Sequence, residues 1–266
     1  MRQLPLPTFP FGLLGPDDPA PVERTGPPLS PWFLTCDHGG NHVPAALDLG
    51  VGDADLARHI GYDIGAAAVA RIMATRLAAE LVIQIYSRLV IDCNRPPSEP
   101  SAFPERSDGT EILGNIDLTG RDGASRTAEI FHPYHAAIEA ALDRRADAGV
   151  ATHLVAVHSY TPAHGEHPEP RPWPVCVLFD KDPSLSLALS RVLAEDGVLV
   201  GENVPYQVGA LGDYTVPVHG ERRKIPHTLI EVRQDLIGDE AGQREWAERL
   251  SLALPRAMAA CERKLP

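Results

Sequence analysis

Two kinds of apolar pattern alternate along the chain, and together they predict alternating strands and helices. Short runs rich in β-branched residues are typical of strands that are buried on both faces of a sheet. The runs predicted to be strands are Trp32 to Cys36, Leu81 to Tyr86, Leu89 to Cys93, His153 to His158, Pro174 to Phe179 and His227 to Val232.

Longer stretches between these runs have the spacing of amphipathic helices. Apolar residues return every three and four positions, so that they share one helix face. The predicted helices are Asp53 to Glu80, Arg126 to Ala148, Pro183 to Glu195 and Asp239 to Lys264. Strands that alternate with helices indicate an α/β protein, and we expect a three-layer α/β/α sandwich with a mostly parallel central sheet. Ligands bind such folds at the carboxyl ends of the strands.

Two segments lack either pattern. Residues 1–30 contain many prolines, and we expect them to form an irregular N-terminal arm. Residues 31–266 are predicted to form a single domain, because no linker or change of composition divides them. The segment from Pro96 to Ser125 is rich in Pro, Gly, Ser and Asp. A connection of this length is either a functional element, such as a lid over the site, or a surface excursion without a catalytic role.

Composition and charge argue against some classes of binding partner for this chain. The chain has 266 residues, of which 44% are hydrophobic, and it can bury a large core. Its formal net charge of −12 argues against a nucleic acid or an anionic membrane as partner, because both need clustered Lys and Arg. The sequence shows neither a basic-then-apolar leader nor the roughly 20 apolar residues that a membrane-spanning helix needs. We therefore expect a cytoplasmic protein.

Two histidines stand at the ends of predicted strands. His38 follows the strand that begins at Trp32, and His158 ends the strand that begins at His153. The carboxyl ends of parallel strands meet at one edge of the sheet, so the two imidazoles can converge there. Neutral imidazole is the commonest protein ligand for zinc, and the pair predicts a zinc site.

The third ligand of this site has two candidates. A hydrolytic zinc site generally has three protein ligands and one open position for water. Asn41 lies three residues after His38, but a neutral amide is a poor zinc ligand and is better suited to binding substrate or shaping the turn. Asp63 lies four residues after His59 in a predicted helix, so either of these side chains could point at the site. A helix cap, an ion pair or a supporting contact to a ligand explains that pair equally well.

A cluster of arginine and asparagine side chains predicts a site for an anion. Arg88, Asn94 and Arg95 bracket the short apolar run that ends at Cys93. Arg offers a planar pair of donors that suits a carboxylate, and Asn can add a hydrogen bond. We expect a small-molecule substrate with a free carboxylate, and we expect Asp92 to hold one arginine in position. A structural salt bridge at the end of the strand is the alternative.

Glu231 interrupts an otherwise apolar strand, and a buried carboxylate needs a reason. Beside zinc, a glutamate can take a proton from water and pass it to the departing nitrogen, which is the acid/base role that amide hydrolysis requires. Arg233 lies two residues further along and shares the same face of the strand, so it could bind substrate beside Glu231. An ion pair of Glu231 with Arg233 or with Arg95 competes with this interpretation.

Several short motifs, taken together, resemble the N-formylglutamate amidohydrolase family. They are CDHGGNHVP, HIGYDIGA, YSRLVIDCNR, GTEILGN, VHSYTP, RPWPVCVLF, ENVPY and IEVRQD, and they occur between Trp32 and Leu236. The resemblance implies a fold related to the zinc carboxypeptidases and the aspartoacylases, a zinc exopeptidase-like sandwich of the phosphorylase/hydrolase-like type. It also implies zinc-dependent hydrolysis of an N-formyl or N-acyl amino acid such as N-formylglutamate, which releases the amino acid and formate or another carboxylate.

The same resemblance suggests roles for individual residues. His38 and His158 are similar to the two zinc histidines of the family, and Glu231 is similar to the catalytic glutamate. The stretch from Asp92 to Arg95 is similar to the carboxylate-binding segment, and Arg88 would be a further contact for the anion.

The chain departs from the carboxypeptidase and aspartoacylase relatives at Asn41. Those relatives have a glutamate ligand at this position, in an H-x-x-E motif. We therefore assign the third zinc position to Asp63 as a hypothesis.

Two other functions remain open. The same residues could serve a zinc metallopeptidase that cleaves a small peptide or a cell-wall fragment. The chain could also be a binding module that kept the fold and lost catalysis. A serine hydrolase is not indicated, because the sequence contains no G-x-S-x-G motif.

Overall fold

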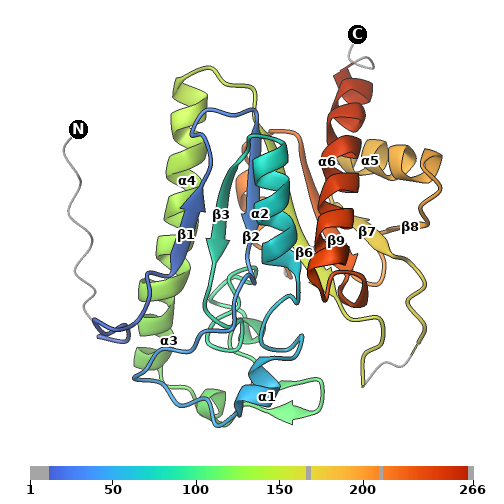
Figure 1. Cartoon of the computed structure of the whole chain (residues 1–266). Helices are drawn as coiled ribbons and strands as arrows, with labels where there is room; N and C mark the ends of the chain where they lie inside the picture. The colour runs from blue at the N-terminus through green and yellow to red at the C-terminus, as the bar shows by residue number, and fades with distance from the viewer. Residues whose placement is uncertain (1–11, 166–168, 210–211, 263–266) are drawn as a thin grey trace.

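A seven-stranded sheet lies at the centre of the computed structural model, which describes residues 12–165, 169–209 and 212–262. The strands run in the order β1-β3-β2-β6-β9-β7-β8 (Figure 1). Their bounds are β1 (Val22–Thr25), β2 (Trp32–Cys36), β3 (Glu80–Gln84), β6 (His153–Tyr160), β7 (Val175–Leu178), β8 (Val200–Glu202) and β9 (His227–Arg233). The neighbours β3, β2, β6 and β9 are parallel to one another, as are β7 and β8, whereas β1 is antiparallel to β3 and β7 to β9.

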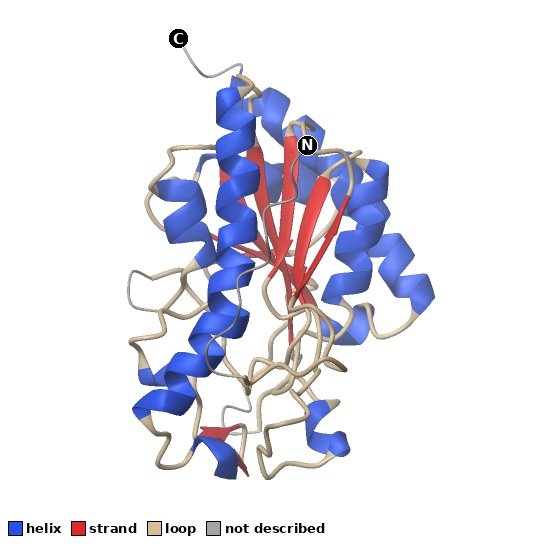
Figure 2. Ribbon diagram, turned by 90° about the vertical axis from the view of Figure 1, so that its left-hand side faces the viewer, coloured by secondary structure: helices blue, strands red, loops and turns tan. Residues whose placement is uncertain are grey.

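Helices cover both faces of this sheet, which confirms the expected three-layer sandwich (Figure 2). The helices on one face are α2 (Ala66–Arg76), α5 (Ser184–Glu195) and α6 (Glu240–Glu262). Those on the other face are the π-helix η3 (Thr127–Phe131) and α4 (His132–Asp147). Successive strand residues point to opposite faces, so Leu34 of β2 packs with the first group of helices and Phe33 with the second.

Short elements occupy the connections between the strands and helices. They are α1 (Asp53–Leu56), η1 (Pro100–Ala102), β4 (Arg106–Ser107), β5 (Thr110–Glu111), η2 (Leu113–Asn115), α3 (Gly120–Arg126), η4 (Val216–Glu221) and η5 (Gln234–Leu236). Loops gather at one end of the sheet (Figure 2). Within the described ranges, no helix combines the length and the apolar character that crossing a membrane would require.

The run from Leu89 to Cys93 is not a strand, whereas the other predicted strands are confirmed within a residue or two. The N–H of Leu89 donates to the Ser87 hydroxyl at 3.2 Å, and the N–H of Asn94 donates to the Asp92 carboxylate at 2.9 Å. Such local bonds replace the hydrogen bonds of a strand ladder. The run is nevertheless fully buried against α4, so its apolar pattern is indistinguishable from that of a core strand.

The predicted helix from Asp53 to Glu80 is wrong in its middle and at its end. The structure contains α1, then turns over residues 57–65, then α2, and Glu80 begins β3. Gly65, directly before α2, has a φ of 80°, and a Cβ atom there would lie 2.2 Å from the carbonyl oxygen of Ile237. Glycine therefore permits both the left-handed turn and the close approach of the two backbones. The turn brings Asp63 to β2, where its N–H donates to the carbonyl of His38 at 2.9 Å.

The other three predicted helices are confirmed. The segment from Arg126 to Ala148 is occupied by the end of α3, η3 and α4, and the segment from Pro183 to Glu195 by α5. The C-terminal helix is confirmed as far as Glu262, and residues 263–266 lie outside the described part of the chain.

Part of the expected irregular arm is a strand. β1 pairs antiparallel with β3, so that Val22 lies opposite Gln84 and Thr25 opposite Leu81. The sequence VERT has no apolar run to reveal this strand, because β1 is a half-exposed edge and its partner supplies the apolar surface. Residues 1–11 of the expected arm lie outside the described residues, and the boundary between arm and domain stays a prediction.

Glu80, the first residue of β3, forms ion pairs with three arginines. Its carboxylate lies 2.8 Å from Arg145, 2.8 Å from Arg144 and 3.2 Å from Arg24. The side chain of Arg145 is only 1% exposed and lies over the ring of Phe33, whereas 43% of the Arg24 side chain is exposed. The buried pair of Glu80 and Arg145 therefore ties α4 to the sheet.

We expect Arg145→Met to lower the free energy of unfolding by about 3 kcal/mol or more, because it leaves a buried carboxylate without its most buried partner. Arg24→Met is the control, and its loss should stay below about 1 kcal/mol because that ion pair is exposed to solvent. Urea unfolding followed by circular dichroism measures both losses. Equal losses in the two variants would show that burial of the ion pair does not increase its contribution to stability.

Candidate active site

Three buried side chains from distant parts of the chain meet beyond the ends of the strands. His38 directly follows β2, His158 lies in β6, and Asp63 lies just before α2. The Oδ2 atom of Asp63 lies 2.8 Å from Nδ1 of His158 and 3.4 Å from Nδ1 of His38. One ligand atom from each residue lies within 4.8 Å of the other two, so the group could hold a metal ion. The structure thus brings together the three residues predicted as metal ligands.

Two further carboxylates contact the imidazole rings at Nε2, on the side of each ring opposite Asp63. Nε2 of His38 lies 2.7 Å from Asp92, and Nε2 of His158 lies 3.0 Å from Asp37. A carboxylate only accepts, so in the neutral ring Nε2 carries the hydrogen and Nδ1 presents its lone pair toward Asp63. Nδ1 of His38 is buried and has no hydrogen-bond partner among the described residues. This orphaned atom, facing a carboxylate and a second Nδ1, fits a cation such as zinc.

Asp37 is held in turn by two hydroxyl groups. The Tyr134 hydroxyl donates to it at 2.5 Å and the Thr215 hydroxyl at 2.9 Å. Burial acts to raise the pKa of Asp37, but the neighbouring His158 and His38 and the Tyr134 hydroxyl outweigh it, and the pKa lies below its ordinary value. The carboxylate therefore stays charged and can keep orienting His158.

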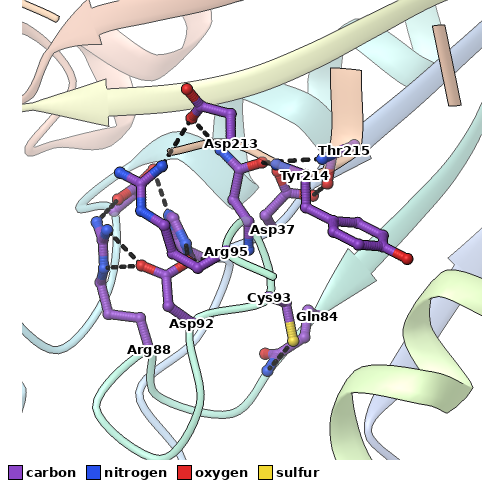
Figure 3. Close-up of polar contacts among 12 residues, drawn as sticks. Asp37, Gln84, Arg88, Asp92, Cys93, Arg95, Asp213, Tyr214 and Thr215 are labelled. Atoms are coloured by element: carbon purple, nitrogen blue, oxygen red, sulfur yellow. Dashed lines mark hydrogen bonds and ion pairs between the residues drawn. The ribbon is translucent and has the colours of Figure 1, made fainter. Parts of the chain in front are cut away.

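Arg88 balances the carboxylates on the other side of the site. It donates to Oδ2 of Asp92 at 2.6 Å and 3.1 Å (Figure 3). It also donates to Oδ1 of Asp63 at 3.4 Å. Burial acts to raise the pKa of Asp92, yet Arg88 and His38 leave it well below its ordinary value. Arg88 lines the pocket, but within the described chain its guanidinium group donates to the carboxylates of the site.

Asn94 and Arg95 are joined to the loop before η4 through Asp213. Oδ1 of Asp213 accepts from Nη1 of Arg95 at 3.0 Å (Figure 3). The same oxygen accepts from Nδ2 of Asn94 at 3.0 Å. Arg95 lines the pocket, and its Nε and Nη2 atoms form no hydrogen bond with any other described residue. It therefore keeps donors available for an anion.

Glu231 lies in β9 directly between His158 of β6 and Cys176 of β7. Its carboxylate is buried and lines the pocket, and its Oε2 atom has no hydrogen-bond partner in the described part of the chain. Burial raises the pKa of Glu231 to about 7. A carboxyl group with this pKa can both accept and release a proton near neutral pH.

Two residues predicted to bind substrate lie outside this pocket. Asn41 is exposed, and its amide donates to the carbonyl of Leu56 at 3.1 Å, so it shapes the turn after β2. Arg233 pairs with Asp235 at 2.8 Å, and no ion pair with Glu231 is found among the described residues. The geometry gives neither residue a contact with the pocket, and their roles toward substrate stay predictions.

The site residues line one pocket of about 420 Å³. Ser101, Pro104 and Ser107 complete its wall, so the segment from Pro96 to Ser125 contributes to the site. The volume is in the range of small-molecule binding sites. A larger cavity of about 790 Å³ lies against α5 and α6, but none of the site residues lines it.

Four residues that support the site were not singled out from the sequence. They are Asp37, Tyr134, Asp213 and Thr215. The sequence offers a signal for Asp37, because it adjoins a candidate ligand. The other three belong to segments without a motif or a strand pattern of their own, and only the fold brings them to the site.

Comparisons with known proteins identify the family and the fold of the chain. Residues 30–238 match the family described as FGase, N-formylglutamate amidohydrolase. The chain is 31% identical to a gene product of Agrobacterium tumefaciens whose crystal structure is known; the TM-score is 0.88, with 94% of this chain and 99% of that chain covered. The N-formylglutamate amidohydrolase of Ralstonia eutropha JMP134 is 22% identical with a TM-score of 0.70, over 92% of this chain and 100% of that one, and shares the fold. No significant match was found among curated proteins.

We expect Asp92→Asn to weaken zinc binding by roughly 10- to 100-fold, because the amide oxygen still accepts from His38 but no longer supplies the negative charge that makes the ring a stronger ligand. Asp122→Asn is the matched control, because the carboxylate of Asp122 is exposed and is not among the residues that contact the candidate ligands. Competition with a chromophoric chelator measures both affinities. Equal affinities in wild type and Asp92→Asn would mean that this carboxylate does not support a metal ligand.

Proposed function

The chain belongs to the N-formylglutamate amidohydrolase family and is a hydrolase that acts on an amide, and we propose that it uses zinc to cleave a small N-formyl or N-acyl amino acid such as N-formylglutamate. One observation carries this proposal: two imidazole rings, the carboxylate of Asp63 and the carboxylate of Glu231 meet in one pocket, and Oε2 of Glu231 has no hydrogen-bond partner among the described residues. We further propose that the protein acts in the cytoplasm.

His38, Asp63 and His158 would hold the zinc ion. Two imidazoles and a carboxylate are a donor set of catalytic zinc sites, which keep one position open. Bound zinc lowers the pKa of a water molecule and polarises the carbonyl of the amide. Asp37 and Asp92 orient the two rings, because each accepts a hydrogen bond from a ring Nε2.

Glu231 is the proposed general base and general acid. Its pKa of about 7 suits a group that first takes a proton from the attacking water and then gives it to the departing nitrogen. Over the whole reaction the formyl carbon gains a hydroxyl group and the nitrogen gains a proton, so that formate and the free amino acid leave. The proton must pass through a group that is not locked in an ion pair, and Glu231 meets this condition among the described residues.

Arg95 is the proposed contact for a carboxylate of the substrate. It lines the pocket, Asp213 fixes one end of its guanidinium group, and two of its nitrogens form no other hydrogen bond in the described chain. The planar guanidinium can therefore offer paired donors to a carboxylate. Arg88 adds positive charge nearby while it holds Asp63 and Asp92.

The size of the pocket favours an acylated amino acid over a peptide. A volume of about 420 Å³ accommodates a small molecule, and the wall formed by Ser101, Pro104 and Ser107 restricts the space beside the arginines. A metallopeptidase would need room for residues on both sides of the scissile bond. The presence of Glu231 beside the candidate ligands argues against a binding module without catalysis.

Glu231→Gln is expected to reduce formate release from N-formyl-L-glutamate by roughly 10²- to 10⁴-fold, because the amide cannot transfer the proton. The zinc content should remain that of the wild type, since Glu231 is not among the ligands. Glu240→Gln, at an exposed carboxylate on α6, should behave as the wild type. Formate release and elemental analysis measure the activity and the zinc content of each variant. Full activity of Glu231→Gln would show that Glu231 does not transfer the proton. Activity that survives treatment with a chelator would show that the reaction does not need zinc.

Arg95→Gln is expected to raise KM for N-formyl-L-glutamate by roughly 10- to 100-fold with a much smaller change in kcat, because a hydrogen bond to a charged group contributes about 1.5–3 kcal/mol. Arg121→Gln, an exposed arginine on α3, is the control. Steady-state kinetics over a range of substrate concentrations separates the two constants. An unchanged KM would show that the substrate carboxylate is bound elsewhere.

A further inference from the structure

A second set of two histidines and an aspartate lies at the same pocket. His59 and His164 line it, and the carboxylate of Asp108 lies between them, 3.3 Å from Nε2 of His59 and 3.2 Å from Nδ1 of His164. One ligand atom from each residue lies within 4.8 Å of the other two. The two histidine side chains are 22% and 20% exposed, compared with 4% for His38 and His158, so this set is nearer to solvent.

Three separate segments supply these side chains. His59 lies in the turns between α1 and α2, Asp108 in the turn that joins β4 to β5, and His164 in the loop that follows β6. The loop after β6 approaches the hairpin closely, since a Cβ atom on Gly165 would lie 2.9 Å from Oδ1 of Asp108. The contacts around Asp108 therefore join three parts of the pocket wall.

The atoms of this set suit a metal ion. The Nε2 atom of His59 faces the carboxylate of Asp108 at 3.3 Å, and a neutral imidazole can present a lone pair at this atom to a metal ion. That atom is buried and forms no hydrogen bond within the described residues. Two imidazoles and one carboxylate are nitrogen and oxygen donors of the kind that bind zinc and related transition metals.

Arg58 is a cation that already contacts this set. Its Nη2 atom lies 3.3 Å from Oδ2 of Asp108. The same guanidinium donates through Nη1 to Asp55 at 3.0 Å and to Thr110 at 2.7 Å, so it keeps two partners when the carboxylate of Asp108 turns to another cation. Arg58 also limits the affinity, because it repels a metal ion across a few ångströms.

We propose that His59, Asp108 and His164 form a second site for a divalent transition-metal ion, separate from the site at His38 and His158. An ion bound there would fasten the β4–β5 hairpin and the loop after β6 to the turns that precede α2. The metal ion would then link three segments of the pocket wall that belong to different parts of the chain. This inference does not depend on the catalytic roles proposed above.

The test uses the full chain, stripped with a chelator and then equilibrated with excess Zn²⁺ before gel filtration and elemental analysis. Asp108→Asn and His164→Gln should each retain about one zinc ion fewer per chain than the wild type, because each loses a ligand of this site only. Asparagine tolerates the left-handed conformation of residue 108, whose φ is 40°, so the hairpin turn should survive the substitution. His132→Gln, at an exposed histidine on α4, is the control and should keep the zinc content of the wild type.

A second readout follows the hairpin itself. Zn²⁺ should slow amide hydrogen exchange of residues 106–111 in the wild type and in His158→Gln, but not in Asp108→Asn. Equal zinc content in wild type and Asp108→Asn, or exchange in the hairpin that Zn²⁺ leaves unchanged, would overturn the proposal. Because the comparison is a difference between variants, a zinc ion lost from Asp108→Asn supports this site even if the site at His158 binds none.

Discussion

The arrangement on which the candidate site depends is a buried carboxylate between two imidazole rings. Asp63 faces Nδ1 of His38 and of His158, and all three side chains are shielded from water. Charged groups in such a place are costly unless each has a partner. The carboxylates of Asp37 and Asp92 behind the rings supply those partners, and they in turn recruit hydroxyl and guanidinium groups from several other segments. Side chains from several segments outside the sheet thus take part in one network of paired charges and hydrogen bonds.

The same balance makes the site responsive to protons. Burial acts to lower the pKa of His158, but Asp37 and Asp63 overcome it and hold the pKa well above its ordinary value. Without a metal ion, the rings therefore carry protons where a cation would lie. A metal ion that binds to Nδ1 atoms must displace those protons, so its affinity rises with pH. The carboxylates that orient the rings thus also set the competition between the metal ion and protons.

The parallel strands explain why much of the site could be predicted. His38, His158 and Glu231 come at or near the carboxyl ends of neighbouring strands, so the order of strands alone brings them together. The run from Leu89 to Cys93 could not be identified as a buried turn, because an apolar pattern reports burial and not the hydrogen bonds that replace a ladder. The break that positions Asp63 depends on the approach of Ile237, a contact across the sequence that no local pattern contains. Tyr134, Asp213 and Thr215 were missed for the same reason, because only the fold brings them to the site.

The pairing of β1 with β3 gives the proline-rich beginning of the chain a role in keeping molecules apart. β3 is an apolar strand, and β1 covers its outer edge with the short polar sequence VERT. A variant that lacks residues 1–30 would leave the backbone groups of that edge unpaired. It would also lack the ion pair between Arg24 and Glu80. An uncovered apolar edge is a template for strands of other molecules and promotes aggregation. β1 therefore protects the fold from self-association, although none of its residues lines the pocket.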